Sequence, residues 1–394
     1  MTSTTTLSEQ SKEQTPASWG GVVSLSLGVF AIVMAEFLPA SLLPRIADDL
    51  GVSEGAAGQS VTVTAVAAGL AGLFLPVLLP RTERRRVMIG LTVLAVASNL
   101  VVAFAPNLPL LLASRFLLGV SLGGFWALAI AIAAQLVPSD RLGRAVMVVN
   151  AGVSLATIAA VPLGSWLGEL WGWRQVFVLG AGAAVLAVAV QFLTLPRLES
   201  TSASGLSALW TALHSKTLLV GLFAVLLTAA GHFTGFTYIR PALESLTDID
   251  ADGLAALLLV YGFGNVLGTV LSGVLADRAL RLAALLFPVS LGAGTLIMVM
   301  TGDTTAGMYV TAAMWGFGFG GVPAVSQTWG ARAEPGRLEQ VGGLIVTVFQ
   351  IAIAAGAIVG GVLVDSVSAS GPLVLGGVTT IVGGVLLTGL IRRA

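Results

Sequence analysis

Twelve long stretches without Asp, Glu, Lys or Arg constrain the fold of this 394-residue chain more than any other feature. Each is at least 21 residues long, and a helix needs about 20 mostly apolar residues to cross a bilayer. The chain is 56% hydrophobic and only 10% charged, whereas soluble domains carry roughly a quarter charged residues. The stretches are 14–35, 55–80, 87–114, 116–139, 145–168, 175–196, 217–239, 253–276, 282–302, 304–331, 340–364 and 366–391.

Lipid surroundings decide the type of secondary structure, because every backbone polar group inside a bilayer needs an internal partner. A transmembrane β-barrel would show alternating polarity over about ten residues, which these uniformly apolar stretches lack. The sequence therefore predicts a multi-pass membrane protein whose spans are helices.

Basic residues predict the orientation of these spans. If the N-terminus is cytoplasmic, 15 Lys and Arg residues fall on the inner side, three (Arg45, Arg174 and Arg240) on the outer side, and Arg115 within a span. This split predicts that both termini are cytoplasmic. The first 18 residues are polar rather than basic, so we expect the first span to be retained and not cleaved as a signal peptide.

The two halves of the chain repeat each other at a nearly constant offset. Glu36-Phe37 aligns with His232-Phe233 at an offset of 196, while Arg81 aligns with Arg278 and Gly123 with Gly320 at 197. Six spans in each half give the repeats the same orientation. The predicted fold is an all-α membrane protein with twelve transmembrane helices in two pseudo-symmetric six-helix bundles. The predicted parts are a cytoplasmic tail (1–18), a first bundle (19–196), a cytoplasmic linker (197–216) and a second bundle (217–394).

The linker contains apolar residues at helical spacing. Leu206, Leu209, Trp210 and Leu213 follow the pattern i, i+3, i+4, i+7, which is typical of an amphipathic helix on a membrane surface. A flexible tether with incidental apolar residues fits the same pattern.

Glu36 and Arg115 are candidate proton-coupling residues, because a charge within a span is costly without a partner or a water-filled cavity. Both lie about 9 Å below the outer surface by helix rise, so they can pair if spans 1 and 4 face one cavity. The protonation of Glu36 would then change with any movement or substrate that separates the two groups. A static ion pair that holds the two spans together is the alternative.

Other polar and aromatic residues within spans are candidates for substrate binding. His232 could bind substrate or relay protons, or it could be a buried histidine bonded to a neighbouring helix. Asn150 and Gln350 could line a central cavity or bridge helices. Trp126 and Phe236 could stack on a substrate or simply pack.

Glycine spacing predicts close helix packing. Pairs four residues apart follow the small-xxx-small pattern that lets helix backbones approach; they are Gly119 and Gly123, Gly316 and Gly320, and Gly356 and Gly360. In span 5, Gly152 is followed by Pro162 and Gly164, and a proline there favours a kink.

Missing motifs narrow the energy source. The two lysines have no glycine five residues upstream, so the chain has no phosphate loop for ATP, and the signatures of membrane hydrolases are also missing. With no Cys and two His, a thiolate or histidine metal site is not expected. We therefore expect a carrier that is not an enzyme, has no cofactor or metal, and is driven by an ion gradient.

Twelve spans in two parallel halves, with basic loops after spans 2 and 8, resemble the major facilitator superfamily. Its loop signature, Gly-x-x-x-Asp-Arg, matches Gly273, Asp277 and Arg278. The first copy departs from it, with Pro76 and Pro80 at the expected Gly and Asp, and keeps only Arg81 and the run Arg84, Arg85 and Arg86. The resemblance implies that these loops gate the inner side by charge contacts.

The segment from Arg115 to Gly124 resembles the span 4 motif of proton-coupled members, in which the Arg is implicated in proton transfer. Gly152, Pro162 and Gly164 resemble a partial span 5 antiporter motif. Span 7 and Glu36-Phe-Leu-Pro are similar to the twelve-span drug:proton antiporter branch, which includes exporters of sugars, nucleosides and chloramphenicol.

The sequence and this resemblance predict an inner-membrane antiporter that exports a small organic molecule in exchange for protons by alternating access. Expected partners are the substrate, protons and the lipid bilayer, without nucleic acid, and we expect a monomer. A facilitator or importer without proton coupling is the alternative. A sensor that does not transport is a further one.

Overall fold

The computed structural model describes residues 17–198, 206–247, 249, 251–302 and 304–391. Within them the chain forms twelve long α-helices, two short α-helices (α7 and α9) and two 3-10 helices of three residues each, with no strand. The long helices are α1 (Trp19–Leu50), α2 (Glu54–Leu78), α3 (Arg84–Ala103), α4 (Leu108–Leu136), α5 (Leu142–Trp171), α6 (Trp173–Thr194), α8 (Lys216–Thr237), α10 (Ala251–Arg278), α11 (Leu280–Thr301), α12 (Thr305–Ala333), α13 (Leu338–Ser366) and α14 (Gly371–Leu390). The predicted fold class, an all-α membrane protein, is confirmed.

Eleven of these helices, within the described residues, are long and apolar enough to cross a membrane. The remaining long helix is α12, with 29 residues, whose Gly, Ser, Thr and Gln content lowers its hydropathy. It packs against α10 and α11, so it completes the second helix group. The N-terminal tail predicted for residues 1–18 lies almost wholly outside the described residues.

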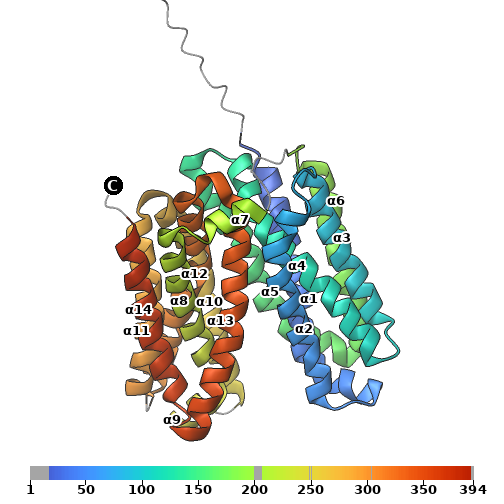
Figure 1. Cartoon of the computed structure of the whole chain (residues 1–394). Coiled ribbons are helices and arrows are strands. Elements are labelled where there is room, and N and C mark those ends of the chain that lie inside the picture. Colours follow the sequence, from blue (N-terminus) through green and yellow to red (C-terminus); the bar gives the residue numbers. More distant parts are fainter. Residues whose placement is uncertain (1–16, 199–205, 248, 250, 303, 392–394) are drawn as a thin grey trace, which may run out of the picture.

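Helix packing follows the repeat. Helices α1 to α6 correspond in order to α8 and α10 to α14, and the main pairs recur: α1 with α5 and α8 with α13, α2 with α4 and α10 with α12, α3 with α6 and α11 with α14. Figure 1 shows the two helix groups side by side, with α7 at one end between them. We call the end that carries α7, the start of α1 and the end of α14 the linker face, and the other end the opposite face.

The paired glycines lie where equivalent helices cross. A Cβ atom on Gly123 of α4 would collide with the carbonyl of Ala68 in α2, and one on Gly320 of α12 would collide with the carbonyl of Asn265 in α10. A side chain of any size would force the backbones apart. The small-xxx-small pattern therefore predicts the same crossing in both halves.

Helix α1 is longer than its uncharged stretch predicts. It continues past Glu36 and Arg45 to Leu50 and ends at Gly51, whose φ of 63° favours glycine. In the second half the equivalent path is broken after Thr237, and the chain continues as the short helix α9 (Ile239–Leu246). Charges near a membrane surface end an apolar stretch without ending a helix, which explains the difference.

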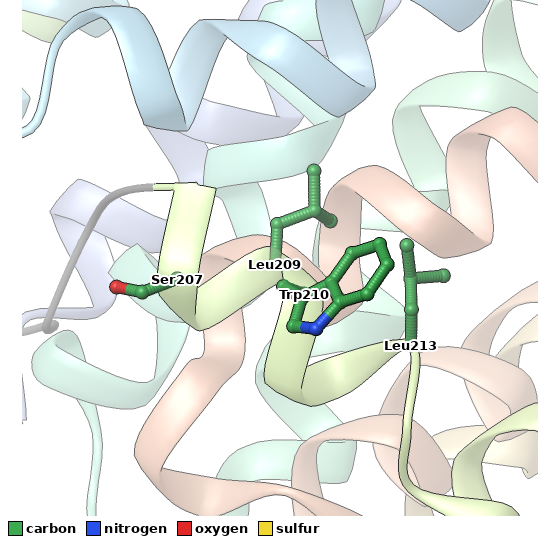
Figure 2. Close-up of a pocket in the computed structure, with 4 residues that line it drawn as sticks. All are labelled: Ser207, Leu209, Trp210 and Leu213. Carbon is green, nitrogen blue, oxygen red and sulfur yellow. The ribbon is translucent and has the colours of Figure 1, made fainter.

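The linker forms a helix, α7 (Leu206–Ala212). Leu209 is buried in the main apolar core, while Trp210 is 68% exposed. Figure 2 shows these two side chains with Leu213 and Ser207 around a shallow depression. The described part of the linker is thus an amphipathic helix, and its contact with a membrane surface stays a prediction.

We expect Gly123→Ala to lower the melting temperature of the purified protein by several degrees, because overpacking costs about 1–3 kcal/mol. The matched control is Gly90→Ala in α3, where a Cβ would meet no atom within 4 Å. Alanine favours a helix by about 1 kcal/mol over glycine, so the control should be unchanged or more stable. Equal melting temperatures for both variants, measured in detergent, would contradict the crossing.

Candidate functional site

Hydrogen bonds between the two helix groups are confined to the linker-face half of the described structure. Five contacts join the groups: Arg84 with Glu339, Gly143 and Arg144 with Asp277, Asn150 with Gln327, Ser154 with Asn265 and Thr269, and Thr347 with Gly69. The deepest of them, at Ser154 and Asn265, lie about 18–20 Å along their helices from the linker face. The arrangement is therefore closed at the linker face.

An ion pair between Arg84 of α3 and Glu339 of α13 is the most buried of these contacts. Arg84 Nε lies 2.5 Å from Glu339 Oε1, Arg84 Nη2 lies 2.6 Å from Oε2, and the side chains are 0% and 1% exposed. Arg84 Nη1 also donates to the carbonyl of Leu79 at 2.6 Å. The guanidinium is thus satisfied on both sides, which a buried charge requires.

Asp277 of α10 joins the two helix groups on the other side of the interface. Its carboxylate accepts from the backbone N–H of Gly143 at 2.5 Å and of Arg144 at 3.1 Å, at the start of α5. A negative charge is favourable there because of the helix dipole. Gly273, one turn earlier in α10, lies against Met147 of α5.

The other predicted gating residues lie at the edge of this contact. Arg81 and Arg278 are exposed. Arg85 donates from Nη2 to the carbonyl of Phe192 at 2.6 Å and lies over the Phe192 ring. Sequence reasoning missed Glu339, although it is the charge that immediately precedes the uncharged stretch 340–364.

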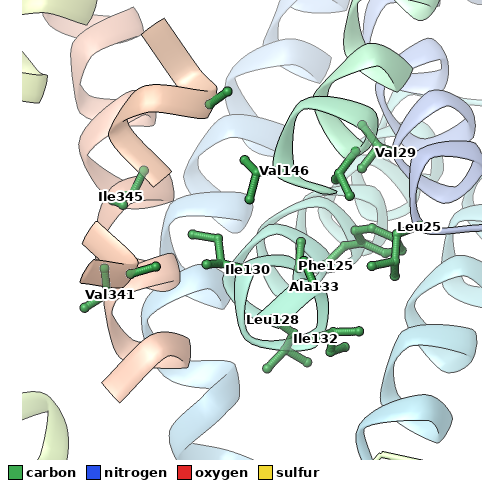
Figure 3. Packing of buried hydrophobic residues seen from close by; sticks show 14 of the residues in the cluster. Leu25, Val29, Phe125, Leu128, Ile130, Ile132, Ala133, Val146, Val341 and Ile345 are labelled. Carbon is green, nitrogen blue, oxygen red and sulfur yellow. The ribbon is translucent and has the colours of Figure 1, made fainter. Parts of the chain in front are cut away.

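Apolar packing reinforces the closed linker face. Figure 3 shows buried side chains of the main core, among them Ile130 of α4, Val146 of α5, and Val341 and Ile345 of α13. At Gly342, next to Val341, the backbone of α13 approaches that of α4 so closely that a Cβ would collide with the carbonyl of Ala127. The backbones of the two helix groups are therefore in direct contact at this point.

Glu36 and Arg115 lie near each other but are not joined by an ion pair. Arg115 is 1% exposed, donates from Nη1 to the carbonyl of Ala35 at 2.8 Å, and places its guanidinium 4.9 Å from the Phe177 ring centroid. Its Nε and Nη2 have no hydrogen-bond partner in the described chain. Glu36 is half-buried beside Ala35. The guanidinium is thus held against the backbone next to the carboxylate, with two donors free.

Aromatic rings surround His232 in the second helix group. Trp315 Nε1 donates to His232 Nδ1 at 3.0 Å. The Phe319 ring lies parallel to the imidazole with centroids 3.6 Å apart, and Phe236 stacks at 5.2 Å. Tyr261 packs edge-on against Trp315 at 5.9 Å. Sequence reasoning singled out His232 and Phe236 and missed Trp315, Phe319 and Tyr261, because nothing in a span's composition reveals which helices pack together.

The predicted site residues occupy two levels. By helix rise, Glu36 and His232 lie about 24–26 Å along their helices from the linker face. Asn150, Trp126 and Gln350 lie only about 12–18 Å from it. Asn150 Nδ2 donates to Gln327 Oε1 at 3.1 Å across the interface, while Gln350 Oε1 has no partner in the described chain.

The span 5 residues lie along one helix. Gly152 packs against α1, where a Cβ would collide with the carbonyl of Ser26. Gly164 is buried, and α5 continues without interruption through residues 161–165. The side chain of Pro162 lies outside what the structure describes, so its contribution to a kink stays a prediction.

Twelve long helices in a twofold repeat, closed at one face, define a multi-pass membrane transporter rather than an enzyme. Residues 25–357 match the family described as Major Facilitator Superfamily, and the chain belongs to this family. It is 37% identical over 378 residues to the purine ribonucleoside efflux pump NepI of Escherichia coli (strain K12), with 96% of both chains covered. It is equally similar to the protein of the same name from Shigella dysenteriae serotype 1.

The fold is also similar to that of a solved transporter. The proton:xylose symporter XylE, bound to 6-bromo-6-deoxy-D-glucose, superimposes with a TM-score of 0.75 over 94% of both chains at 13% sequence identity. At this identity the likeness concerns the fold alone. The predicted superfamily is thus confirmed by the family match and the sequence relatives.

We expect Glu339→Gln to open the linker face, because removing one partner of a buried ion pair costs about 3–5 kcal/mol. The chain has no Cys, so spin labels at Ser139→Cys and Gly336→Cys report the distance between the two helix groups directly. Longer distances are expected in this variant than in the otherwise unchanged protein.

The control for this measurement is Glu334→Gln, which removes an ion pair with Arg337 inside one helix group. Its label distances should not change. Replacing both buried charges, with Arg84→Met and Glu339→Leu together, should restore closure because no charge is then left unpaired. Unchanged distances in Glu339→Gln would show that the ion pair does not hold this face closed.

Proposed function

We propose that the chain exports purine ribonucleosides or close analogues in exchange for protons, by alternating access, across a bacterial cytoplasmic membrane. The substrate class is suggested by the 37% identity, over 96% of both chains, to pumps named for purine ribonucleoside efflux. The observation that carries the proton-coupling part is the position of Arg115, buried against the carbonyl of Ala35 beside Glu36. In this proposal both termini are cytoplasmic and the linker face is the inner side.

In this mechanism Glu36 carries the proton and Arg115 is its charge partner. Arg115 keeps two buried donors free, and a buried cation without a counter-ion favours ionisation of a nearby carboxylate. Any step that brings the carboxylate onto Nε and Nη2 therefore favours proton release. Any step that separates them favours proton uptake.

The closed linker face corresponds to the state that is open to the outside. Hydrogen bonds between the helix groups end at the level of Ser154 and Asn265, and Glu36 and His232 lie beyond it. Rocking about the levels of Asn150 and Gln350 would break the linker-face contacts and close the opposite face, as in other transporters built from repeats. We place the substrate between the level of Asn150 and Gln350 and the level of Glu36 and His232. The working unit in this proposal is a monomer.

We expect Glu36→Gln to abolish purine ribonucleoside export driven by a pH gradient in proteoliposomes, reducing the rate at least about 100-fold to the background of empty vesicles. Glutamine keeps the size of the side chain and cannot release a proton. Exchange of labelled for unlabelled inosine across the same vesicles moves no net proton, so it should continue in the variant.

The control is Glu169→Gln, at an exposed ion pair with Arg45 near the opposite face, which should leave export unchanged. An internal pH dye measures proton movement in the same vesicles. Inosine uptake without a dye signal in the unchanged protein would favour the facilitator, and pH-driven export by Glu36→Gln would remove Glu36 from the mechanism.

A further inference from the structure

The hydrogen bond from Trp315 fixes the protonation of His232. An indole N–H can only donate, so His232 Nδ1, at 3.0 Å, must be an acceptor and carry no proton. The ring is therefore the neutral tautomer with its proton on Nε2. Within the described residues Nε2–H has no hydrogen-bond partner, although the side chain is only 1% exposed.

Flanking rings hold the imidazole in one plane. Phe319 lies parallel to it, with ring centroids 3.6 Å apart and planes 13° from parallel, and Phe236 stacks at 5.2 Å and 27°. Both phenyl rings are half-buried. Neither the position of the ring nor the direction of Nε2–H can change without disturbing this stack.

The level of His232 matters as much as its orientation. It is the repeat equivalent of Glu36, the proposed proton carrier, and the two residues lie at the same depth, beyond the last hydrogen bond between the helix groups. Polar groups nearer the linker face, such as Asn150, already form hydrogen bonds between the two helix groups. Nε2 is not among the fully buried atoms that lack a partner, so it keeps accessible surface from which it can donate to a ligand that supplies an acceptor.

Purine chemistry matches one such donor. N1 accepts a hydrogen bond in adenosine, but in inosine and guanosine it carries a hydrogen and cannot accept. The acceptor O6 is present only in inosine and guanosine. N3 lies beside the ribose, while N7 is an exposed acceptor in every natural purine. Pyrimidines have no equivalent nitrogen. A single fixed N–H donor that serves all purine ribonucleosides and rejects pyrimidines is therefore best matched to N7.

We propose that His232 determines the specificity for purines by donating from Nε2–H to N7 of the base, and that Trp315 is the positioning residue that sets its tautomer. This inference rests on the proposed function and deepens it. The half-buried rings of Phe236 and Phe319 supply apolar surface against which the base packs.

The test compares adenosine with 7-deazaadenosine, in which a C–H replaces N7, as competitors of labelled adenosine on the purified full-length protein. The unchanged protein should bind the deaza compound at least about fivefold more weakly, because the Nε2–H donor is left unpaired. In His232→Phe, which keeps the ring stack, the ratio of the two dissociation constants should fall to about one.

The matched control is His214→Phe, at the only other histidine of the chain, which is exposed beside α7. It should keep the full ratio. Trp315→Phe frees Nδ1 and should lower the ratio, since the ring then adopts both tautomers. If His232→Phe does not fold because the indole N–H is left unpaired, the double variant with Trp315→Phe removes both partners and answers the same question.

Each outcome separates the two proposals. Equal binding of both compounds by the unchanged protein, or the same ratio in His232→Phe, would overturn the role of His232 and leave purine export intact. Failure of the unchanged protein to bind any purine ribonucleoside would overturn the proposed function and this inference with it. A ratio that falls to about one in His232→Phe, is lowered in Trp315→Phe and is kept in His214→Phe supports both.

Discussion

The ion pair between Arg84 and Glu339 removes two charges from water, and the closed linker face depends on it. Such a pair is tolerated only with excellent geometry and further hydrogen bonds, and both conditions are met by its bidentate contact and the carbonyl of Leu79. Water that entered between the groups would weaken the attraction. The apolar packing around Ile345 and the close approach at Gly342 keep the pair dry, so charge and packing support each other.

The repeat explains why this ion pair exists. Asp277 caps the start of α5 in one half, and the equivalent position in the other half is Pro80, which cannot cap α13. There the carboxylate comes from Glu339 of α13 itself and the cation from α3. The carboxylate thus comes from α10 on one side of the interface and from α13, the repeat equivalent of α5, on the other. Gln340, the repeat equivalent of Gly143, keeps unpaired polar atoms.

Divergence between the halves also explains the chemistry at the level of the proposed site. Equivalent positions carry Glu36 in α1 and His232 in α8. The first is next to an arginine with free donors, and the second is fixed by an indole and stacked rings. In the proposed mechanism one half handles the proton, while the other offers a fixed hydrogen bond and an apolar surface. The two tasks proposed for this exporter thus fall to different repeats of one scaffold.

Sequence alone determined the helices, their number in two repeats and the close crossings at glycines such as Gly123 and Gly320, because lipid imposes these on local composition. It also singled out Glu36, Arg115 and His232, since polar groups in apolar spans are costly. Only the tertiary structure decided which residues are partners. Glu339 pairs with Arg84 across 255 residues of sequence, and Trp315 pairs with His232 across 83. Pairing across helices depends on their rotation and depth, which apolar spans of similar composition do not encode locally.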